Sequence, residues 1–376
     1  MSALVPASVR VCDAAAWPVS GPVVVEVAAT AETIERLLGA LPVEVARSRP
    51  HPGVLRLTAT AAALRAALAV ADPRLADHLD ARLASWRQPP PDLQTPAGAL
   101  PTASRTVVMG ICNVTPDSFS DGGVAYLPAE HPRPALTAAA ALLEAGADVI
   151  DVGGESTRPG AEPVSVEEEL RRVLPVVTEL AASGAVVSID TSKAAVARAA
   201  LEAGAALVND VSAGALDPVL LDTVAAAEVP YVLMHMQGTP RTMQHDPRYL
   251  DVVAEVHQAL DTSLDRLTER GIDRERVVLD PGIGFGKRLE HNLALLRELS
   301  TFTAFGRPVL VGASRKSFLG TLTGGAEPTD RLEGSLAVAT LAVAAGARIL
   351  RVHDVAETVR AVRVAEAVCR SPEPPS

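Results

Sequence analysis

Polar and charged side chains follow a series of short apolar runs in the second part of the chain, each at the point where its run ends. Carboxylates, amides, a lysine, arginines and histidines are all represented. The residues are Asn113, Asp151, Asp190, Asn209, Asp210, His235, Asp280, Ser314, Arg315, Lys316, Arg351 and His353. Aspartate and asparagine also cap helices, so any single one of them has a structural explanation. Eight successive run ends of this kind predict one shared site instead.

Three of these residues, Asp190, Asn209 and Asp280, suit a flat heterocycle that presents adjacent N–H donors, such as an amino-pyrimidinone. Buried carboxylates need partners that donate hydrogen bonds to them, and the edge of such a ring supplies two donors side by side. Lys316 would meet a carbonyl oxygen of the ring. We therefore expect a heterocycle site rather than a site for a sugar or a nucleic acid.

A second set of residues is basic and suits an anion. The set is Arg158, Arg315, Lys316, Arg351 and His353. Arg351 and His353 lie two apart on an expected strand and so face the same side; a hydrogen-bonded core histidine is the alternative for His353. Asn113 is a neutral oxygen ligand that suits Mg²⁺ carrying substrate phosphates. Ser317 stands near an expected helix start, where backbone N–H groups attract a carboxylate or phosphate.

The segment "DPGIGFGK", residues 280–287, resembles a phosphate-binding loop but lacks the required spacing to a Gly-Lys-Ser/Thr ending. Its glycines more simply allow a close backbone approach in a tight loop. We expect Phe285 to face a ligand, with core packing as the alternative. Met234 would cover a ring face, whereas His235 and Cys112 are expected to be structural.

The elements that must position these residues alternate between apolar runs and helical segments. Examples of the runs are "ADVIDVG", "AVVSID", "RVVLD" and "PVLVGAS", and "SVEEELRRVLPVVTELAASG" has helical spacing with Ser165 at its start. Runs this apolar are typical of parallel strands that are covered by helices. Eight strand–helix units predict a (β/α)8 TIM barrel, whose functional residues gather at the carboxyl ends of the strands. A doubly wound open sheet is the alternative, although it usually has fewer strands.

The chain of 376 residues divides into three parts in this interpretation. Residues 1–88 form a small N-terminal α/β domain of unknown role, residues 89–105 a Pro-rich linker, and residues 106–370 the barrel. A formal charge of −11 argues against a nucleic-acid partner, which needs a basic surface. The three cysteines show no metal or disulfide spacing, and we find neither a signal peptide nor a membrane span. A cytoplasmic protein is therefore expected.

Eight motifs together resemble the dihydropteroate synthase family, in order along residues 106–367. They are "GICNVTPDSFSDGG", "ADVIDVGGESTRPGA", "VSIDTSK", "LVNDVSAG", "VLMHMQGTPRTMQ", "VLDPGIGFGK", "VGASRKSFLG" and "RVHDV". The resemblance implies a TIM barrel that joins 6-hydroxymethyl-7,8-dihydropterin diphosphate to p-aminobenzoate, with Mg²⁺, in folate biosynthesis. It also implies that sulfonamides target the enzyme and that the enzyme is a homodimer.

The family's site residues carry over onto matching positions. For the pterin they are Asp151, Asp190, Asn209, Met234, Asp280, Phe285, Ser314 and Lys316. For the diphosphate they are Asn113, Thr157, Arg158, Arg351 and His353, with the metal on Asn113. For p-aminobenzoate they are Phe119, Pro159, Phe285 and Ser317, with Lys316 beside them. Asp121, Lys316 and Arg351 are the expected catalytic residues.

The reaction that the resemblance implies is dissociative: pyrophosphate leaves first, and the aminobenzoate nitrogen then attacks a pterin cation. Asp121 would bring negative charge to that cation from a loop that closes. Two alternatives stay open at this point. One is a pterin-binding methyltransferase domain, which would not need Asn113, Arg351 and His353 for a diphosphate. The other is a catalytically inactive paralogue that binds a pterin.

Overall fold

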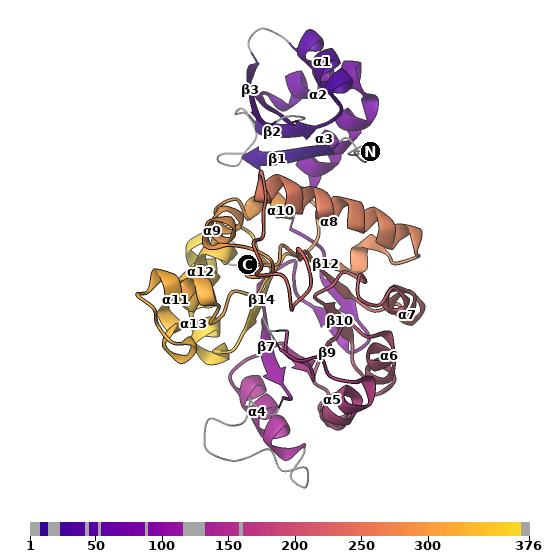
Figure 1. The fold of residues 1–376 in the computed structure, drawn as a ribbon, viewed down its shortest axis with the longest axis vertical. Coiled ribbons are helices and arrows are strands. Elements are labelled where there is room, and N and C mark those ends of the chain that lie inside the picture. The colour runs from indigo at the N-terminus through magenta and orange to yellow at the C-terminus, as the bar shows by residue number, and fades with distance from the viewer. Residues whose placement is uncertain are drawn as a thin grey trace, which may run out of the picture.

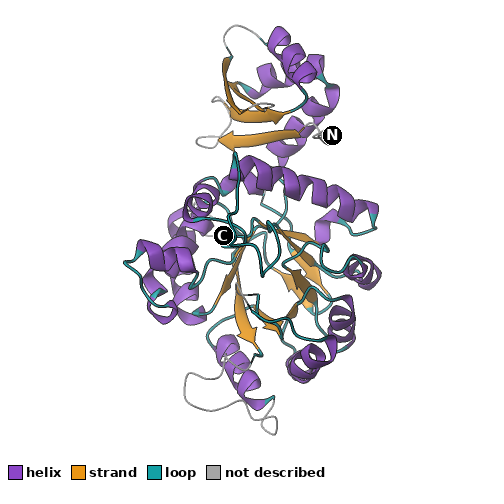
Figure 2. Ribbon diagram, viewed as in Figure 1, coloured by secondary structure: helices purple, strands orange, loops and turns teal. Residues whose placement is uncertain are grey.

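The second part of the chain is a closed barrel of parallel strands (Figures 1 and 2). The computed structural model describes residues 8–13, 23–41, 45–51, 54–86, 89–115, 132–157 and 161–369. Within these ranges the strands pair in the order β12-β11-β10-β9-β8-β7-β14-β13, and a parallel bridge between Leu279 and Val309 joins the two ends. The strands are β7 (Val107–Asn113), β8 (Val149–Gly153), β9 (Val187–Asp190), β10 (Leu207–Asp210), β11 (Tyr231–Met234), β12 (Val277–Asp280), β13 (Leu310–Val311) and β14 (Ile349–Val352). The TIM barrel is confirmed, and the open-sheet alternative is excluded.

Helices surround this barrel and bury the outer faces of its strands (Figure 2). They are α4 (Arg133–Glu144), α5 (Val166–Ala182), α6 (Ala194–Glu202), α7 (Val219–Ala227), α8 (Val252–Glu269), α9 (Leu289–Arg297), α10 (Ser300–Thr303), α11 (Ser317–Leu322), α12 (Leu332–Ala344) and α13 (Val355–Cys369). Local signals in the sequence mark their ends. The Ser165 hydroxyl accepts a hydrogen bond from the Glu168 amide at the start of α5, and Gly184 follows its end with a φ of +86°. None of the helices in the described ranges is long and apolar enough to cross a membrane.

The first part of the chain folds around its own apolar core. Its strands β1 (Ser8–Asp13), β2 (Val23–Ala28), β3 (Ala46–His51) and β4 (Val54–Ala59) form an antiparallel sheet in the order β1-β2-β4-β3. The helices α1 (Ala31–Ala40), α2 (Ala61–Ala71) and α3 (Pro73–Trp86) pack on it, with Leu37, Leu57 and Leu68 fully buried. The Thr30 hydroxyl caps α1 by accepting a hydrogen bond from the Thr33 amide. The sequence pattern did not reveal β1 or β3.

Two short strands lie inside the segment that the sequence suggests is an unpatterned linker. β5 (Leu93–Thr95) and β6 (Gly98–Leu100) pair as an antiparallel hairpin. Leu93 and Leu100 are buried with the first inward-facing residues of the barrel strands, such as Val107 and Ile349. This hairpin therefore closes the amino-terminal end of the barrel, opposite to the end where the polar residues gather.

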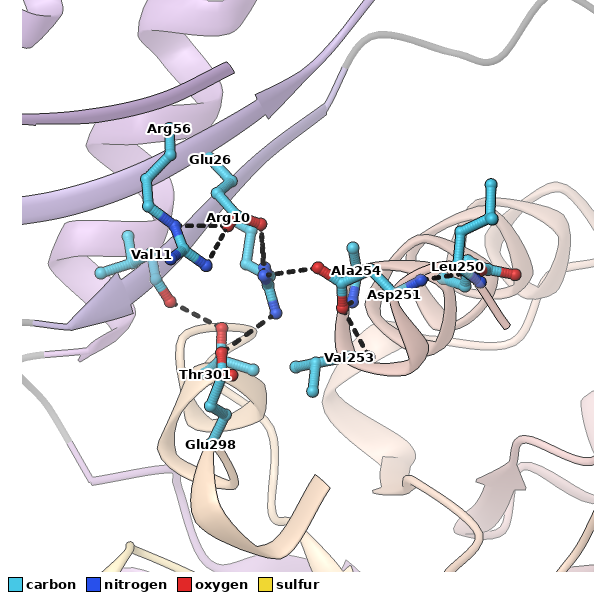
Figure 3. Close-up of polar contacts among 11 residues, drawn as sticks. Arg10, Val11, Glu26, Arg56, Leu250, Asp251, Val253, Ala254, Glu298 and Thr301 are labelled. Carbon is cyan, nitrogen blue, oxygen red and sulfur yellow. Dashed lines mark hydrogen bonds and ion pairs between the residues drawn. The ribbon is translucent and has the colours of Figure 1, made fainter. Parts of the chain in front are cut away.

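The N-terminal domain contacts the barrel through charged and polar side chains at the start of α8, the end of α9 and in α10 (Figure 3). Arg10 of β1 is 3% exposed and forms ion pairs with Glu26 of the same sheet, with Asp251 at the start of α8 and with Glu298 at the end of α9. The Thr301 hydroxyl donates to the backbone carbonyl of Val11 at 2.6 Å. Buried polar contacts of this kind hold the two parts in one arrangement.

A second contact between the same parts combines charge with an aromatic ring. The guanidinium group of Arg82 in α3 lies 3.8 Å from the ring centroid of Phe305 and 2.5 Å from the carboxylate of Asp261 in α8. Phe305 itself packs against the buried His257 at a ring-centroid distance of 4.4 Å. Burial lowers the pKa of His257 well below its usual value, and Arg82 and Arg10 add to that effect. His257 is therefore neutral, and it packs against the Phe305 ring that Arg82 of the N-terminal domain covers.

Replacing Arg10 by methionine should lower the free energy of unfolding by about 3 kcal/mol, because it leaves buried Glu26 with one ion-pair partner fewer. Arg65→Met is the matched control: it removes an exposed Arg–Asp pair within the same domain, for which about 0.5 kcal/mol is expected. Chemical unfolding measures both. Equal effects of the two variants would mean that the interface charges do not stabilise the fold.

Candidate active site

The inward-facing residues at the carboxyl ends of the strands form one cluster, as the sequence predicts. Side chains alternate in direction along a strand, so that Asp190 of β9 lies in register with Asn209 of β10 on one side and with Gly153 of β8 on the other. Met234 lies in register with Asp280. Asp210, next to Asn209, points the other way: its carboxylate accepts bonds from the Ser212 and Gly214 amides and from the Tyr231 hydroxyl. Asn209 and not Asp210 therefore belongs to the site.

Arg351 lies at the centre of the cluster, between two carboxylates. Its Nε donates to Asp151 at 2.6 Å and its Nη2 to Asp190 at 2.7 Å, although the three residues are up to 200 positions apart in the sequence. Asn209 donates to the same Asp151 oxygen at 3.0 Å. Gly312 lies against the Arg351 side chain, where a Cβ would come within 3.7 Å of it. Strands β8, β9, β10 and β14 thus share one polar network.

The electrostatics of this network follow from burial. Burial raises the pKa of Asp190 to about 7; Arg351 opposes the shift, and Asp151 adds to it. Burial alone would lower the pKa of Arg351, but attraction to Asp151 and Asp190 raises it well above its usual value. The second oxygen of Asp151 is buried and has no hydrogen-bond partner among the described residues. The network therefore holds an acceptor that is available to a donor from outside.

Asp280 and Lys316 form the opposite side of the cluster. An Asp280 oxygen accepts a hydrogen bond from the Gly282 amide at 2.7 Å. Burial raises the pKa of Asp280, with Lys316 opposing the shift, and burial lowers the pKa of Lys316 to about 8, with Asp280 opposing. Lys316 donates to the carbonyl of Ile283, and its ammonium lies 4.4 Å from the ring centroid of Phe285. The carboxylate of Asp280, the ammonium group of Lys316 and the ring of Phe285 therefore lie on the same side of the site.

The glycine-rich segment that follows β12 is a tight loop against the loop that follows β11. Gly282 and Gly286 have φ values of +69° and +60°. A Cβ on Gly282 would overlap the carbonyl oxygen of His235, and one on Gly286 would lie 2.5 Å from that of Gln237. Only glycine meets both demands. The prediction of a close backbone approach is confirmed.

Ser314 and His353 form a third group at the mouth. The Ser314 hydroxyl lies 3.0 Å from Nδ1 of His353 and accepts a hydrogen bond from the His353 amide at 3.2 Å. Ser317 is exposed and is the first residue of α11. Arg315 differs from the expectation that it joins the basic group: its guanidinium group forms an ion pair with Asp354 at 2.6 Å. The anion site must therefore be built without Arg315.

Asn113 ends β7 beside these groups. A Cβ on Gly153 would lie 3.6 Å from an oxygen of Asn113 and 3.6 Å from one of Asp190, so the two side chains flank the same glycine. No group of three or more His, Cys, Asp or Glu residues suited to a metal ion occurs in the described part of the chain. A lone amide oxygen fits Mg²⁺ that takes its other ligands from substrate phosphates and water, and it does not fit a metal held by protein alone.

Comparisons with known proteins agree with this geometry. A family model described as "Pterin binding enzyme" matches residues 109–353. Dihydropteroate synthase of Escherichia coli K12 is 50% identical over 267 residues, which are 71% of this chain and 93% of that protein. The enzyme of Mycobacterium leprae is 47% identical over 263 residues, 68% of this chain and 91% of its own. The chain belongs to the dihydropteroate synthase family of pterin-binding enzymes.

Solved structures of dihydropteroate synthases are also similar to this chain. A Yersinia pestis dihydropteroate synthase with a sulfonamide drug complex has a TM-score of 0.69 and 46% identity, and covers 74% of this chain and all of its own. The Xanthomonas albilineans enzyme in complex with 7,8-dihydropteroate has a TM-score of 0.64 and 47% identity, with 72% of this chain and 95% of its own covered. The family resemblance seen in the motifs is confirmed.

Four of the expected synthase residues lie outside the described residues: Phe119, Asp121, Arg158 and Pro159. Thr157 is partly buried and ends the described stretch after β8. Cys112 is buried, which raises the pKa of its thiol to about 12 and agrees with a core role. Burial lowers the pKa of His235 to about 3, and Lys287 adds to the shift. His235 is therefore a neutral structural residue.

The sequence alone did not indicate the roles of two lysines, the partly buried Lys193 and the buried Lys287. Lys193 donates to Glu155 at 2.6 Å, to Glu169 at 2.5 Å and to the carbonyl of Val164 at 2.7 Å, and so holds both ends of the loop after β8. Lys287 holds the loops after β11 and β12. The only sequence signal is a lysine that follows a strand end closely. The contacts of Lys193 with Glu155 and Val164, and of Lys287 with His235, join residues far apart in the sequence, which a motif does not show.

Proposed function

We propose that the chain condenses 6-hydroxymethyl-7,8-dihydropterin diphosphate with p-aminobenzoate, giving 7,8-dihydropteroate and pyrophosphate. The observation that carries the proposal is the network of Asp151, Asp190 and Asn209 around Arg351, faced by Asp280 and Lys316. It offers acceptors to a pterin ring on one side and a cation to a diphosphate on the other. Related enzymes have been solved with 4-aminobenzoic acid and with 7,8-dihydropteroate.

The proposed roles of the site residues are those that the family resemblance implies. Asp151, Asp190, Asn209 and Asp280 accept hydrogen bonds from the pterin, Lys316 and Ser314 donate to it, and Met234 and Phe285 cover its ring. Arg351, His353, Thr157, Arg158 and Asn113 bind the diphosphate. Phe119, Pro159, Phe285 and Ser317 form the p-aminobenzoate pocket. α11 begins at the exposed Ser317, and the backbone N–H groups of a helix start suit the carboxylate of that substrate.

Bond breaking precedes bond making in the proposed reaction. As the methylene–oxygen bond of the pterin diphosphate breaks, negative charge gathers on the diphosphate, and Arg351 and His353 stabilise it. Asn113 would hold Mg²⁺ on the diphosphate, and the ion when bound adds further positive charge. The amine nitrogen of p-aminobenzoate then attacks the pterin cation and loses a proton. Asp121 stabilises that cation with its negative charge.

The proposal is tested by measuring pyrophosphate release from purified protein with both substrates and Mg²⁺. Release should require p-aminobenzoate. A methyltransferase domain or an inactive paralogue would release none, so failure to detect aminobenzoate-dependent release would reject the proposal in favour of one of these.

Asp121→Ala should lower kcat by about 10²-fold and change pterin diphosphate affinity by less than threefold, because Asp121 acts on charge that develops only in the transition state. Single-turnover kinetics and equilibrium binding separate the two effects. Asp121→Asn is the control that keeps the shape and removes the charge, and it should lose kcat equally. If kcat and affinity fall together, Asp121 is a structural turn residue.

The value of kcat/KM should be highest between about pH 7 and about pH 8, since those are the pKa values of Asp190 and Lys316. Below this window Asp190 takes up a proton and no longer accepts from the pterin. Above it Lys316 loses its proton and no longer donates as a cation. Each limb should approach tenfold per pH unit. Lys316→Arg should move the alkaline limb to higher pH, and an unmoved limb would assign it to another group.

We further propose that the enzyme acts in the cytoplasm as a homodimer. α12 and α13 pack together and expose Leu341, Val364 and Val368, at 68%, 65% and 79% of their surfaces. Apolar side chains exposed on adjacent helices favour an interface with a second copy. Sedimentation of the purified protein, compared with Leu341→Glu, tests this part of the proposal.

A further inference from the structure

Lys287 is a buried cation that no role in the proposed reaction uses. It lies at the end of the glycine-rich loop and is only 3% exposed. Its ammonium group lies 2.9 Å from the carbonyl oxygen of Phe285, 3.2 Å from that of His235 and 3.0 Å from Nδ1 of the His235 ring. A lysine ammonium has three hydrogen atoms to donate, so all three are used within the protein.

The acceptors of Lys287 belong to two different loops, and each loop contains or directly follows a residue that binds substrate in the proposed function. His235 directly follows Met234, which covers the pterin ring in the proposed function. Phe285 lies 4.4 Å from the Lys316 ammonium, at the junction of the pterin and aminobenzoate pockets. Lys287 therefore connects His235, the residue after Met234, to the backbone of Phe285.

The other contacts between the two loops do not replace the hydrogen bond from Lys287 to the carbonyl of Phe285. At Gly282 and Gly286 the backbone of one loop packs closely against the backbone of the other. Further polar contacts join the loops: Tyr249 donates to the Gly286 carbonyl at 2.8 Å, Gln244 donates to the Gly284 carbonyl at 2.9 Å, and the exposed Arg288 pairs with Asp246. None of these contacts involves the carbonyl of Phe285.

We propose that Lys287 is a positioning residue of the aminobenzoate pocket, which fixes the backbone of Phe285 so that its ring stays against Lys316. The proposal rests on the proposed function. Burial lowers the pKa of Lys287 to about 7, with Asp280 opposing the shift and Lys316 adding to it. That value would suit a general base, but the ammonium group is enclosed and faces its own three acceptors. Proton transfer is therefore not its role.

Lys287→Met keeps the length of the side chain and removes its donors. We expect KM for p-aminobenzoate to rise about tenfold, the effect of losing one bond to a charged donor, while kcat and the affinity for pterin diphosphate change less than threefold. Arg288→Met is the matched control. It removes a positive charge from the next residue, whose side chain pairs with Asp246 and lies about half exposed. Its KM should equal that of the unmodified enzyme.

A double-mutant cycle shows whether Lys287 acts through Phe285. In a Phe285→Ala background, Lys287→Met should raise KM for p-aminobenzoate less than twofold further, because the ring that it positions is gone. A merely structural lysine would give additive effects, and these would overturn the proposal. If Lys287→Met does not fold, Lys287→Gln, which keeps two donors, replaces it in the same cycle.

The outcome separates this proposal from the one on which it rests. If the unmodified enzyme releases no pyrophosphate, the proposed function fails. If it is active and folded Lys287→Met has an unchanged KM for p-aminobenzoate, or weakens both substrates equally, the positioning role fails and the proposed function stands.

Discussion

Replacing Arg351 by alanine should lower kcat/KM for the pterin diphosphate on the order of 10³-fold. The substitution removes the cation that binds the diphosphate, and it also leaves Asp151 and Asp190 without their ion-pair partner. Breaking a buried ion pair on one side typically costs about 3–5 kcal/mol. Steady-state kinetics and thermal unfolding should both register the loss. Arg105→Gln, which removes an arginine–carboxylate pair with Asp148 at the other end of the barrel, is the control and should leave kcat/KM within threefold.

Arg351→Ala removes both a diphosphate contact and the ion pairs with Asp151 and Asp190, and a pterin without phosphates separates these two effects. The affinity of the variant for this pterin should fall about tenfold, because an unpaired Asp190 takes up a proton more readily and accepts hydrogen bonds less well. The diphosphate substrate should lose far more. If the two ligands weaken equally, Arg351 acts only on the carboxylates and its assignment to the diphosphate is wrong.

Asp280→Asn should lower the affinity for the pterin by about 10²- to 10³-fold and leave the fold intact. The asparagine oxygen still accepts from the Gly282 amide, but the charge that strengthens bonds to the ring is gone, and one oxygen acceptor becomes a donor. Two charge-assisted hydrogen bonds at about 1.5–3 kcal/mol each account for a loss of this size. Isothermal calorimetry with the pterin measures it.

The stability of Asp280→Asn should move in the opposite direction. Because burial raises the pKa of Asp280, the ionised carboxylate disfavours the folded state at any pH above its unfolded pKa, and a neutral amide removes that cost. The unfolding temperature at neutral pH should therefore stay the same or rise. A lower unfolding temperature with unchanged affinity would show that Asp280 stabilises the loop and does not bind the pterin.

The barrel was predictable because its strands carry their own signals. The apolar runs form strands that are buried on both faces. The polar residues that follow them lie at the carboxyl end of the barrel, where the ends of all the strands come together. The period of two along a strand also explains why Asn209 faces the site while Asp210 faces away and caps the following turn. Local pattern and overall fold agree in this part of the chain.

Other features depend on contacts between distant residues and were not predictable. β1 alternates polar with apolar residues, and its buried Arg10 makes sense only with Asp251 and Glu298 beside it. The hairpin of β5 and β6 has few apolar residues, and Leu93 and Leu100 gain their burial from the barrel end. The pairing of Arg351 with Asp151 and Asp190, rather than with an anion alone, also needed the fold.

The most direct test of the account uses p-aminobenzoate labelled with ¹⁵N in its amine. Purified protein is incubated with this substrate, pterin diphosphate and Mg²⁺, and the products are measured by mass spectrometry. The product should be 7,8-dihydropteroate that carries the label, formed with one pyrophosphate per molecule. Pyrophosphate without labelled product, or no turnover of either substrate, would contradict this expectation.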